Sequence, residues 1–122
     1  IDIRYNDYRN KEGELMAREQ LKNLTEPMFY VLLTLYTPRH GYEVMQMIQD
    51  ITSDRVKVGA GTLYSLLSRF EKEKIIEQVA EDGRRKIYKL TTKGQEILEN
   101  EHERLKALVR DGDNYIGGQI NE

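Results

Sequence analysis

The sequence predicts a mainly α-helical protein with one small β-hairpin, and three observations support this fold class. First, apolar residues recur with helical spacing in five stretches of the 122-residue chain. Second, the period changes to that of short strands on either side of Asp82-Gly83, a dipeptide typical of hairpin turns. Third, 39% of the residues are apolar and 33% are charged, as in a small helical protein with much exposed surface. The length suits one domain with short extensions.

Five helices are expected, at about residues 14–23, 26–36, 42–51, 62–74 and 92–111. The second is apolar almost all round and is therefore predicted to be the central, buried helix. Thr25 suits its N-cap, and Pro27 lies in its first turn, where the missing N–H costs nothing. The fourth helix carries its apolar residues on one face: Leu63, Leu66, Leu67 and Phe70.

The stretches between these helices are expected to be turns, strands and loops. Residues 37–41 are predicted to be a break and residues 56–58 a short extended piece. Strands are predicted at residues 76–79 and 86–90, joined by a turn at residues 81–84. Compact helices followed by a two-stranded hairpin are typical of a winged helix-turn-helix domain.

The chain is therefore divided into four parts. Residues 1–23 are predicted to form an N-terminal arm and helix, and residues 24–91 the winged helix-turn-helix domain. Residues 92–111 form a C-terminal dimerisation helix, which Asp111-Gly112 is expected to end, and residues 112–122 a flexible tail.

Charge and composition narrow the function. The net charge is −2, but residues 54–93 carry ten bases and six acids, so the positive charge lies in one segment. Such asymmetry favours polyanion binding. The lack of cysteine excludes disulfides and thiolate metal sites, and no metal site is predicted. No apolar run approaches the roughly 18 residues of a membrane span, and no signal-peptide pattern is seen, so a cytoplasmic protein is expected.

The fourth helix has an outward face that suits the major groove of DNA. Opposite its apolar stripe lie short hydroxyl-bearing and basic side chains, which can reach phosphates and base edges. Gly59 and Gly61 lie just before the expected start of this helix and would let its N-terminus approach phosphates closely. The alternative is an ordinary amphipathic surface helix.

The hairpin carries three consecutive cations, Arg84, Arg85 and Lys86, directly after its turn. Like charges repel and contribute nothing to a fold, so they indicate contact with a phosphate backbone or minor groove. The alternative is a solvated charge run that keeps the hairpin edge from pairing with other chains. The predicted DNA-binding residues are Tyr42, Gly61, Thr62, Tyr64, Ser65, Ser68, Arg69, Arg84, Arg85 and Lys86.

Six short motifs in order resemble the PadR family of bacterial transcriptional regulators, over about residues 24–110. They are Leu24-Thr25-Glu26-Pro27, His40-Gly41-Tyr42-Glu43, Gly61-Thr62-Leu63-Tyr64, Arg69-Phe70-Glu71, Gly83-Arg84-Arg85-Lys86-Ile87-Tyr88 and Leu90-Thr91-Thr92-Lys93-Gly94. The resemblance implies that the motif at residues 61–64 opens a recognition helix and that residues 83–88 form the wing. It also implies a homodimer of the compact branch, with a single C-terminal helix, that represses nearby genes. The arm at about residues 1–20 is longer than the family's.

The last helix has a narrow apolar stripe that a second copy could cover. A free helix with so few apolar contacts is marginal in water, and Leu98 and Leu105 are seven residues apart, which is heptad spacing. The predicted dimer interface comprises Leu15, Leu21, Ile97, Leu98, Leu105, Leu108 and Val109. The alternative is that this helix folds back on its own domain.

The resulting hypothesis is a ligand-responsive repressor that binds a palindromic operator as a homodimer. No catalytic arrangement stands out, so the protein is not expected to be an enzyme. No cofactor is expected beyond an unidentified small-molecule effector, which the resemblance implies. The alternative function is a winged-helix module for protein–protein interaction. A docking face of that kind would expose an apolar patch, and the fourth helix exposes only Tyr64 there.

Overall fold

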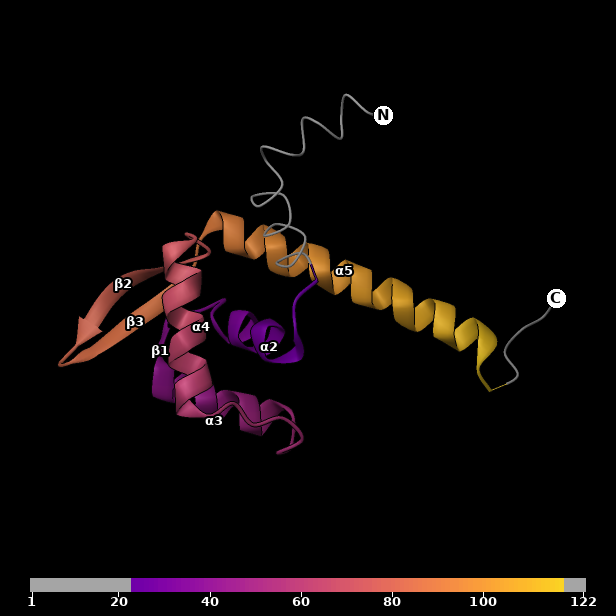
Figure 1. Cartoon of the computed structure of the whole chain (residues 1–122), viewed down its shortest axis with the longest axis horizontal. Coiled ribbons are helices and arrows are strands. Elements are labelled where there is room, and N and C mark those ends of the chain that lie inside the picture. The colour runs from indigo at the N-terminus through magenta and orange to yellow at the C-terminus, as the bar shows by residue number, and fades with distance from the viewer. Residues whose placement is uncertain (1–22, 118–122) are drawn as a thin grey trace, which may run out of the picture.

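The structure is a computed structural model that describes residues 23–117. Four helices and three strands make up this part, and their order and bounds can be followed in Figure 1. They are α2 (Glu26–Thr34), β1 (Arg39–His40), α3 (Gly41–Ile51), α4 (Ala60–Lys72), β2 (Ile76–Asp82), β3 (Arg85–Leu90) and α5 (Thr92–Tyr115). The predicted N-terminal arm and helix, with Leu15 and Leu21, lie outside the described residues.

Side-chain caps fix the starts of three helices. The Thr25 hydroxyl accepts a hydrogen bond from Met28 N at 3.3 Å at the start of α2, as predicted. His40 caps α3. Thr91 accepts from Gly94 N at 3.1 Å at the start of α5, and its hydroxyl also lies 2.7 Å from the carbonyl oxygen of Lys74. This last bond fastens α5 to the turn that follows α4.

The sheet has three antiparallel strands in the order β1-β3-β2, where the sequence predicted two. The prediction of a break at residues 37–41 missed β1, because two residues are too few to show a period. Arg39 pairs with Tyr88, and His40 pairs with Ile87. The hairpin strands are also longer than predicted, since its turn is confined to Gly83-Arg84. Gly83 has a φ of +65°, which glycine adopts without strain.

One hydrophobic core joins all four helices to the sheet. α2 lies at its centre, as its sequence predicted, with Val31 and Leu32 fully buried, and Leu35 directly after the helix is fully buried too. α3 and α4 contribute their apolar faces, and the base of the hairpin closes the core. Burying Phe70 alone is worth about 3–5 kcal/mol by the cost of truncating such a side chain.

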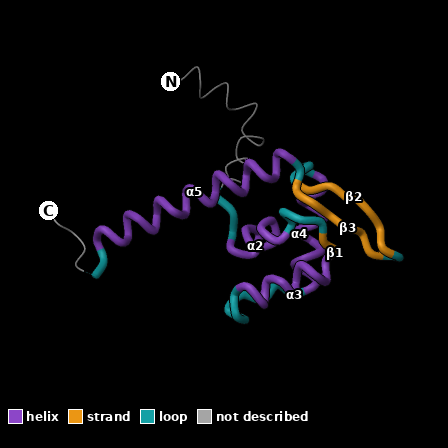
Figure 2. The backbone as a smooth tube through the Cα atoms, turned by 180° about the vertical axis from the view of Figure 1, so that it is seen from behind, coloured by secondary structure: helices purple, strands orange, loops and turns teal. Residues whose placement is uncertain are grey.

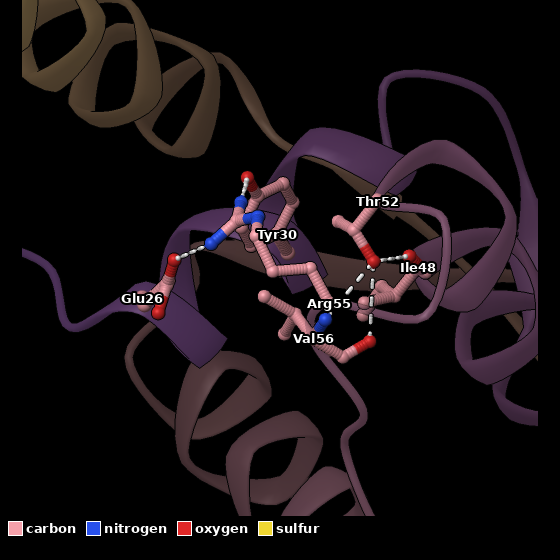
Figure 3. Close-up of polar contacts among 6 residues, drawn as sticks. All are labelled: Glu26, Tyr30, Ile48, Thr52, Arg55 and Val56. Carbon is pink, nitrogen blue, oxygen red and sulfur yellow. Dashed lines mark hydrogen bonds and ion pairs between the residues drawn. The ribbon is translucent and has the colours of Figure 1, made fainter.

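The loop between α3 and α4 holds no strand, although the sequence predicted an extended piece at residues 56–58. Polar contacts fix the loop instead (Figure 3). The Arg55 guanidinium lies 2.9 Å from a carboxylate oxygen of Glu26 and 2.8 Å from the hydroxyl of Tyr30, both on α2. Thr52 receives a hydrogen bond from Val56 N at 3.1 Å. These bonds tie the first part of the loop to α2 and to the end of α3.

α5 divides into a packed half and a projecting half. Its N-terminal half packs on α2 and β3, and its C-terminal half extends past them on the side opposite the hairpin (Figures 1 and 2). The predicted end at Asp111-Gly112 is wrong, because the helix continues to Tyr115. Gly112 does not end the helix, because glycine weakens a helix without breaking it and the residues on either side can adopt helical conformation. No helix among residues 23–117 is long and apolar enough to cross a bilayer.

Candidate nucleic-acid interface

A groove of about 350 Å³ opens between α4, the start of α3 and the hairpin. These three elements meet on the side of the molecule from which β2 and β3 project (Figure 1). Ten residues line it: His40, Gly41, Tyr42, Tyr64, Leu67, Ser68, Arg84, Arg85, Lys86 and Tyr88. Hydroxyl groups and cations dominate this lining, as in surfaces that bind phosphate.

The N-terminus of α4 is open. Gly59 is its N-cap and provides no side-chain hydrogen bond, so the first backbone N–H groups of the helix have no cap. A Cβ at Gly59 or Gly61 would meet no atom within 4 Å, and Thr62 is exposed. The start of α4 is therefore free for a phosphate to approach.

Tyr64 lies against the start of α3. A Cβ at Gly41 would come within 2.7 Å of the Tyr64 hydroxyl oxygen, so the ring occupies the space that a larger residue at position 41 would fill. Tyr64 is nevertheless 52% exposed and faces the groove. The glycine of the His-Gly-Tyr motif is thus explained by the contact between α3 and α4.

The hairpin supplies the positive charge. Arg84, Arg85 and Lys86 are all exposed, and no carboxylate among residues 23–117 forms an ion pair with any of them. Arg85 Nη1 lies 3.1 Å from His40 Nε2. Tyr88 lies at the base of the groove, where burial raises the pKa of its hydroxyl, so the hydroxyl remains a neutral hydrogen-bond donor.

The groove gathers six of the ten predicted DNA-binding residues: Tyr42, Tyr64, Ser68, Arg84, Arg85 and Lys86. Gly61, Thr62, Ser65 and Arg69 lie on α4 outside it. The first three of these are exposed. Arg69 is half-buried, and its Nε lies 3.4 Å from a carboxylate oxygen of Glu73.

The predicted DNA-binding residues do not include His40, Gly41 and Tyr88, which also line the groove. All three belong to quoted motifs, but their position in the groove depends on the pairing of β1 with β3, which the sequence did not reveal. A two-residue strand carries no periodic signal that could have found them.

The predicted dimer stripe is divided by the fold. Leu98 is 2% exposed within its own core, so the prediction that it faces a partner is wrong, whereas Ile97 is half-buried against that core. Leu108 and Val109 are 51% and 61% exposed, and Leu105 is half-buried. The exposed part of the stripe therefore lies beyond the core.

Glu101 lies between Leu98 and Leu105 on α5, and although it is charged, it is only 1% exposed. Its carboxylate accepts hydrogen bonds from Leu24 N at 3.2 Å and from Arg104 at 2.7 and 2.9 Å. The buried charge is therefore paired, and it ties the start of the described chain to α5. No cluster of metal-ligating side chains occurs in the part of the chain that the structure describes.

Relatives with known sequences are similar to this chain over its central part. It is 36% identical over 70 residues to uncharacterized protein X of Lysinibacillus sphaericus, covering 54% of this chain and 64% of that protein. It is 34% identical over 71 residues to an uncharacterized 37.1 kDa protein in transposon TN4556 of Streptomyces fradiae, covering 58% of this chain and 20% of that protein. The chain thus spans less than two thirds of either relative.

Solved structures share the fold. A PadR family transcriptional regulator from Eggerthella lenta superposes with a TM-score of 0.64 and 22% identity, over 95% of this chain and 98% of that one. A transcriptional regulator from Clostridium thermocellum gives 0.61 and 22%, over 73% and 90%. The model of the transcriptional regulator PadR-like family matches residues 30–100, from α2 to the packed half of α5. This match spans more than half of the sequence, and the chain therefore belongs to the PadR-like family of transcriptional regulators.

Proposed function

We propose that this transcriptional regulator binds double-stranded DNA through α4 and the β2–β3 hairpin, and that it represses transcription as a homodimer on a palindromic operator. The observation that carries the proposal is the groove, which sets the outward face of α4 beside three exposed cations of the hairpin. Membership in a family of transcriptional regulators agrees with the prediction that the protein is not an enzyme.

The geometry supports different DNA contacts for α4 and for the hairpin. α4 is thirteen residues long with an uncapped N-terminus, so it can enter the major groove with its first two turns. Tyr64, Ser65 and Ser68 then face base edges or flanking phosphates. The hairpin cations lie to one side of α4 and would meet the phosphate backbone or the adjacent minor groove.

A second copy would complete the DNA site. Two recognition helices read successive faces of the major groove when they lie about 34–36 Å apart. The projecting half of α5 exposes Leu108 and Val109 with no cover among residues 23–117, and a two-fold pairing of α5 would bury them. The expected operator is therefore palindromic. A small-molecule effector and a cytoplasmic location belong to the same proposal.

Salt titration of DNA binding tests the proposal. Fluorescence anisotropy with a labelled mixed-sequence duplex should show an affinity that falls steeply as salt rises, because cations that neutralise phosphates release counterions. Selection from a random pool should then recover a palindrome. A chain that binds no duplex at low salt would contradict the proposal.

The same DNA-binding experiments distinguish the proposed function from the alternative, a module for protein–protein interaction. In such a module the hairpin cations would meet an acidic partner, and the protein would show no specific binding to a selected duplex. The outward face of α4 exposes one large apolar side chain, Tyr64, whereas docking faces are enriched in aromatic and apolar residues at their centre. This composition favours DNA over a protein partner.

A further inference from the structure

The wall of the groove holds a contact between a histidine and an arginine that no cap or strand pairing requires. Arg85 Nη1 lies 3.1 Å from His40 Nε2. Because β1 pairs His40 with Ile87, Arg85 stands two residues away along β3, on the same face of the sheet. The His40 side chain is 12% exposed, whereas Arg85 is exposed. A nearly buried ring thus supports a cation that faces solvent.

Each ring nitrogen of His40 lies near a hydrogen-bond donor, but only one of the two can act as the acceptor. Nδ1 lies 3.4 Å from Glu43 N, so it would accept a hydrogen bond that caps α3, and Nε2 would accept from Arg85. A neutral imidazole carries one proton and can accept at only one nitrogen. The ring therefore makes one of these two hydrogen bonds at a time.

The contact with Arg85 is the stronger of the two. It is shorter, and its donor is a charged guanidinium, which strengthens the hydrogen bond. α3 keeps the other half of its capping box when Nδ1 is protonated, because His40 N donates to Glu43 Oε1 at 3.0 Å. The same carboxylate oxygen is 3.7 Å from Nε2, beyond hydrogen-bond distance, so it does not hold a proton on that nitrogen.

We propose that His40 is a positioning residue for the hairpin: its Nε2 accepts a hydrogen bond from Arg85 and holds the guanidinium at the groove wall, where the remaining N–H donors meet a DNA phosphate. This inference rests on the proposed function. A guanidinium donates in a fork, so one bond to His40 leaves donors for a second acceptor. An arginine that is already held loses less conformational freedom on binding, and the complex gains affinity.

His40→Asn separates positioning from capping. Asparagine is a strong N-cap, so its side chain can accept from Glu43 N, but it is too short to reach Arg85. The variant should fold at least as stably as the original and bind duplex DNA about three- to tenfold more weakly, the change expected for one net hydrogen bond. An unchanged affinity would overturn the proposal.

A double-mutant cycle shows whether His40 acts through Arg85. In an Arg85→Gln background, His40→Asn should cause no further loss of affinity, because the group that it positions is gone. Arg84→Gln is the matched control: it removes the neighbouring cation, and its effect should add to that of His40→Asn. A His40→Asn effect that persists without Arg85 would make His40 a DNA contact in its own right and overturn the positioning role.

The ring itself gives a readout that does not depend on DNA. Nitrogen-15 NMR of the free protein should show His40 with a proton on Nδ1 and a bare Nε2, and Arg85→Gln should shift the ring toward the other tautomer. A ring protonated on Nε2 in both proteins would overturn the proposal. A chain with the expected tautomer that fails to bind any duplex would instead contradict the proposed function, so the two failures are distinguishable.

Discussion

Gly94 is the residue whose identity the packing dictates most directly. A Cβ at this position would lie 2.1 Å from the carbonyl oxygen of Ile75, a backbone atom that cannot turn aside. The absence of a side chain lets the first turn of α5 touch the turn between α4 and β2. This backbone contact explains the glycine of the Thr-Thr-Lys-Gly motif. The hydroxyl of Thr91, at the start of the motif, donates to the same carbonyl oxygen at 3.0 Å.

Gly94→Ala should therefore lower the free energy of unfolding by about 1–3 kcal/mol, the usual cost of overpacking. Gly112→Ala is the control, since a Cβ there meets no atom within 4 Å in the same helix. It should stabilise the protein by about 0.5–1 kcal/mol through helix propensity. Urea unfolding measures both changes, and equal stabilities for the two variants would refute the packing argument.

The hairpin cations are expected to act on DNA and not on the fold. Replacing both Arg84 and Arg85 with alanine should weaken binding to all duplexes about equally and flatten the salt slope by roughly 1–2 units. The free energy of unfolding should change by no more than about 0.5 kcal/mol, because these side chains are exposed. Anisotropy titrations at several salt concentrations test this, and an unaltered slope would remove the hairpin from the DNA interface.

At the scale of the element, α4 combines a buried and an outward face. Leu63, Leu67 and Phe70 fix its position in the core, and the Arg55 contacts with α2 fix the loop that leads into it. A helix held from both directions presents its outward side chains in one orientation. Such rigidity is what base readout requires.

Arg69→Ala tests whether this face reads sequence. The contact of Arg69 with Glu73 uses Nε, which leaves the terminal nitrogens to bond a guanine. The substitution should cost about 1–3 kcal/mol on the selected operator and much less on random duplex. Binding free energies on the two DNAs provide the comparison. Equal losses on both would make Arg69 a phosphate contact, and no loss on either would leave it as the partner of Glu73 alone.

At the scale of the whole molecule, α5 links the core to a projecting segment that exposes Leu108 and Val109. The helix is anchored by Leu98 and by the paired, buried Glu101, so its distal half leaves the body in a fixed direction (Figure 1). A dimer formed there would set the distance between two copies of α4.

Leu108→Asp together with Val109→Asp should convert the proposed dimer to a monomer. Both side chains are exposed, so the fold should survive, while charges in an apolar interface oppose association. Sedimentation equilibrium measures the mass. Specific DNA binding should fall with the dimer, whereas weak non-specific binding remains. Lys106→Gln, elsewhere on the same helix, is the control. A double variant that stays dimeric would place the interface in another part of the chain.

The sequence by itself predicted the four helices found among residues 23–117, the hairpin and the family. Their signals are local: apolar periodicity, caps such as Thr25, and Asp82-Gly83 at the turn each depend on near neighbours. Six of the predicted DNA-binding residues also line one groove, because the two motifs that contain most of them lie on adjacent elements.

Only the tertiary structure decided how the last helix is used and which residues complete the groove. Leu98 and Leu108 look alike along the helical stripe, but Leu98 is 2% exposed and Leu108 is 51% exposed, a difference set by which part of α5 packs on the rest of the fold. Glu101 could be buried because Arg104 and Leu24 N satisfy its charge. His40 reached Arg85 through pairing between residues far apart in the chain. Long-range pairing leaves no period in the sequence, so these features emerge only when the chain has folded.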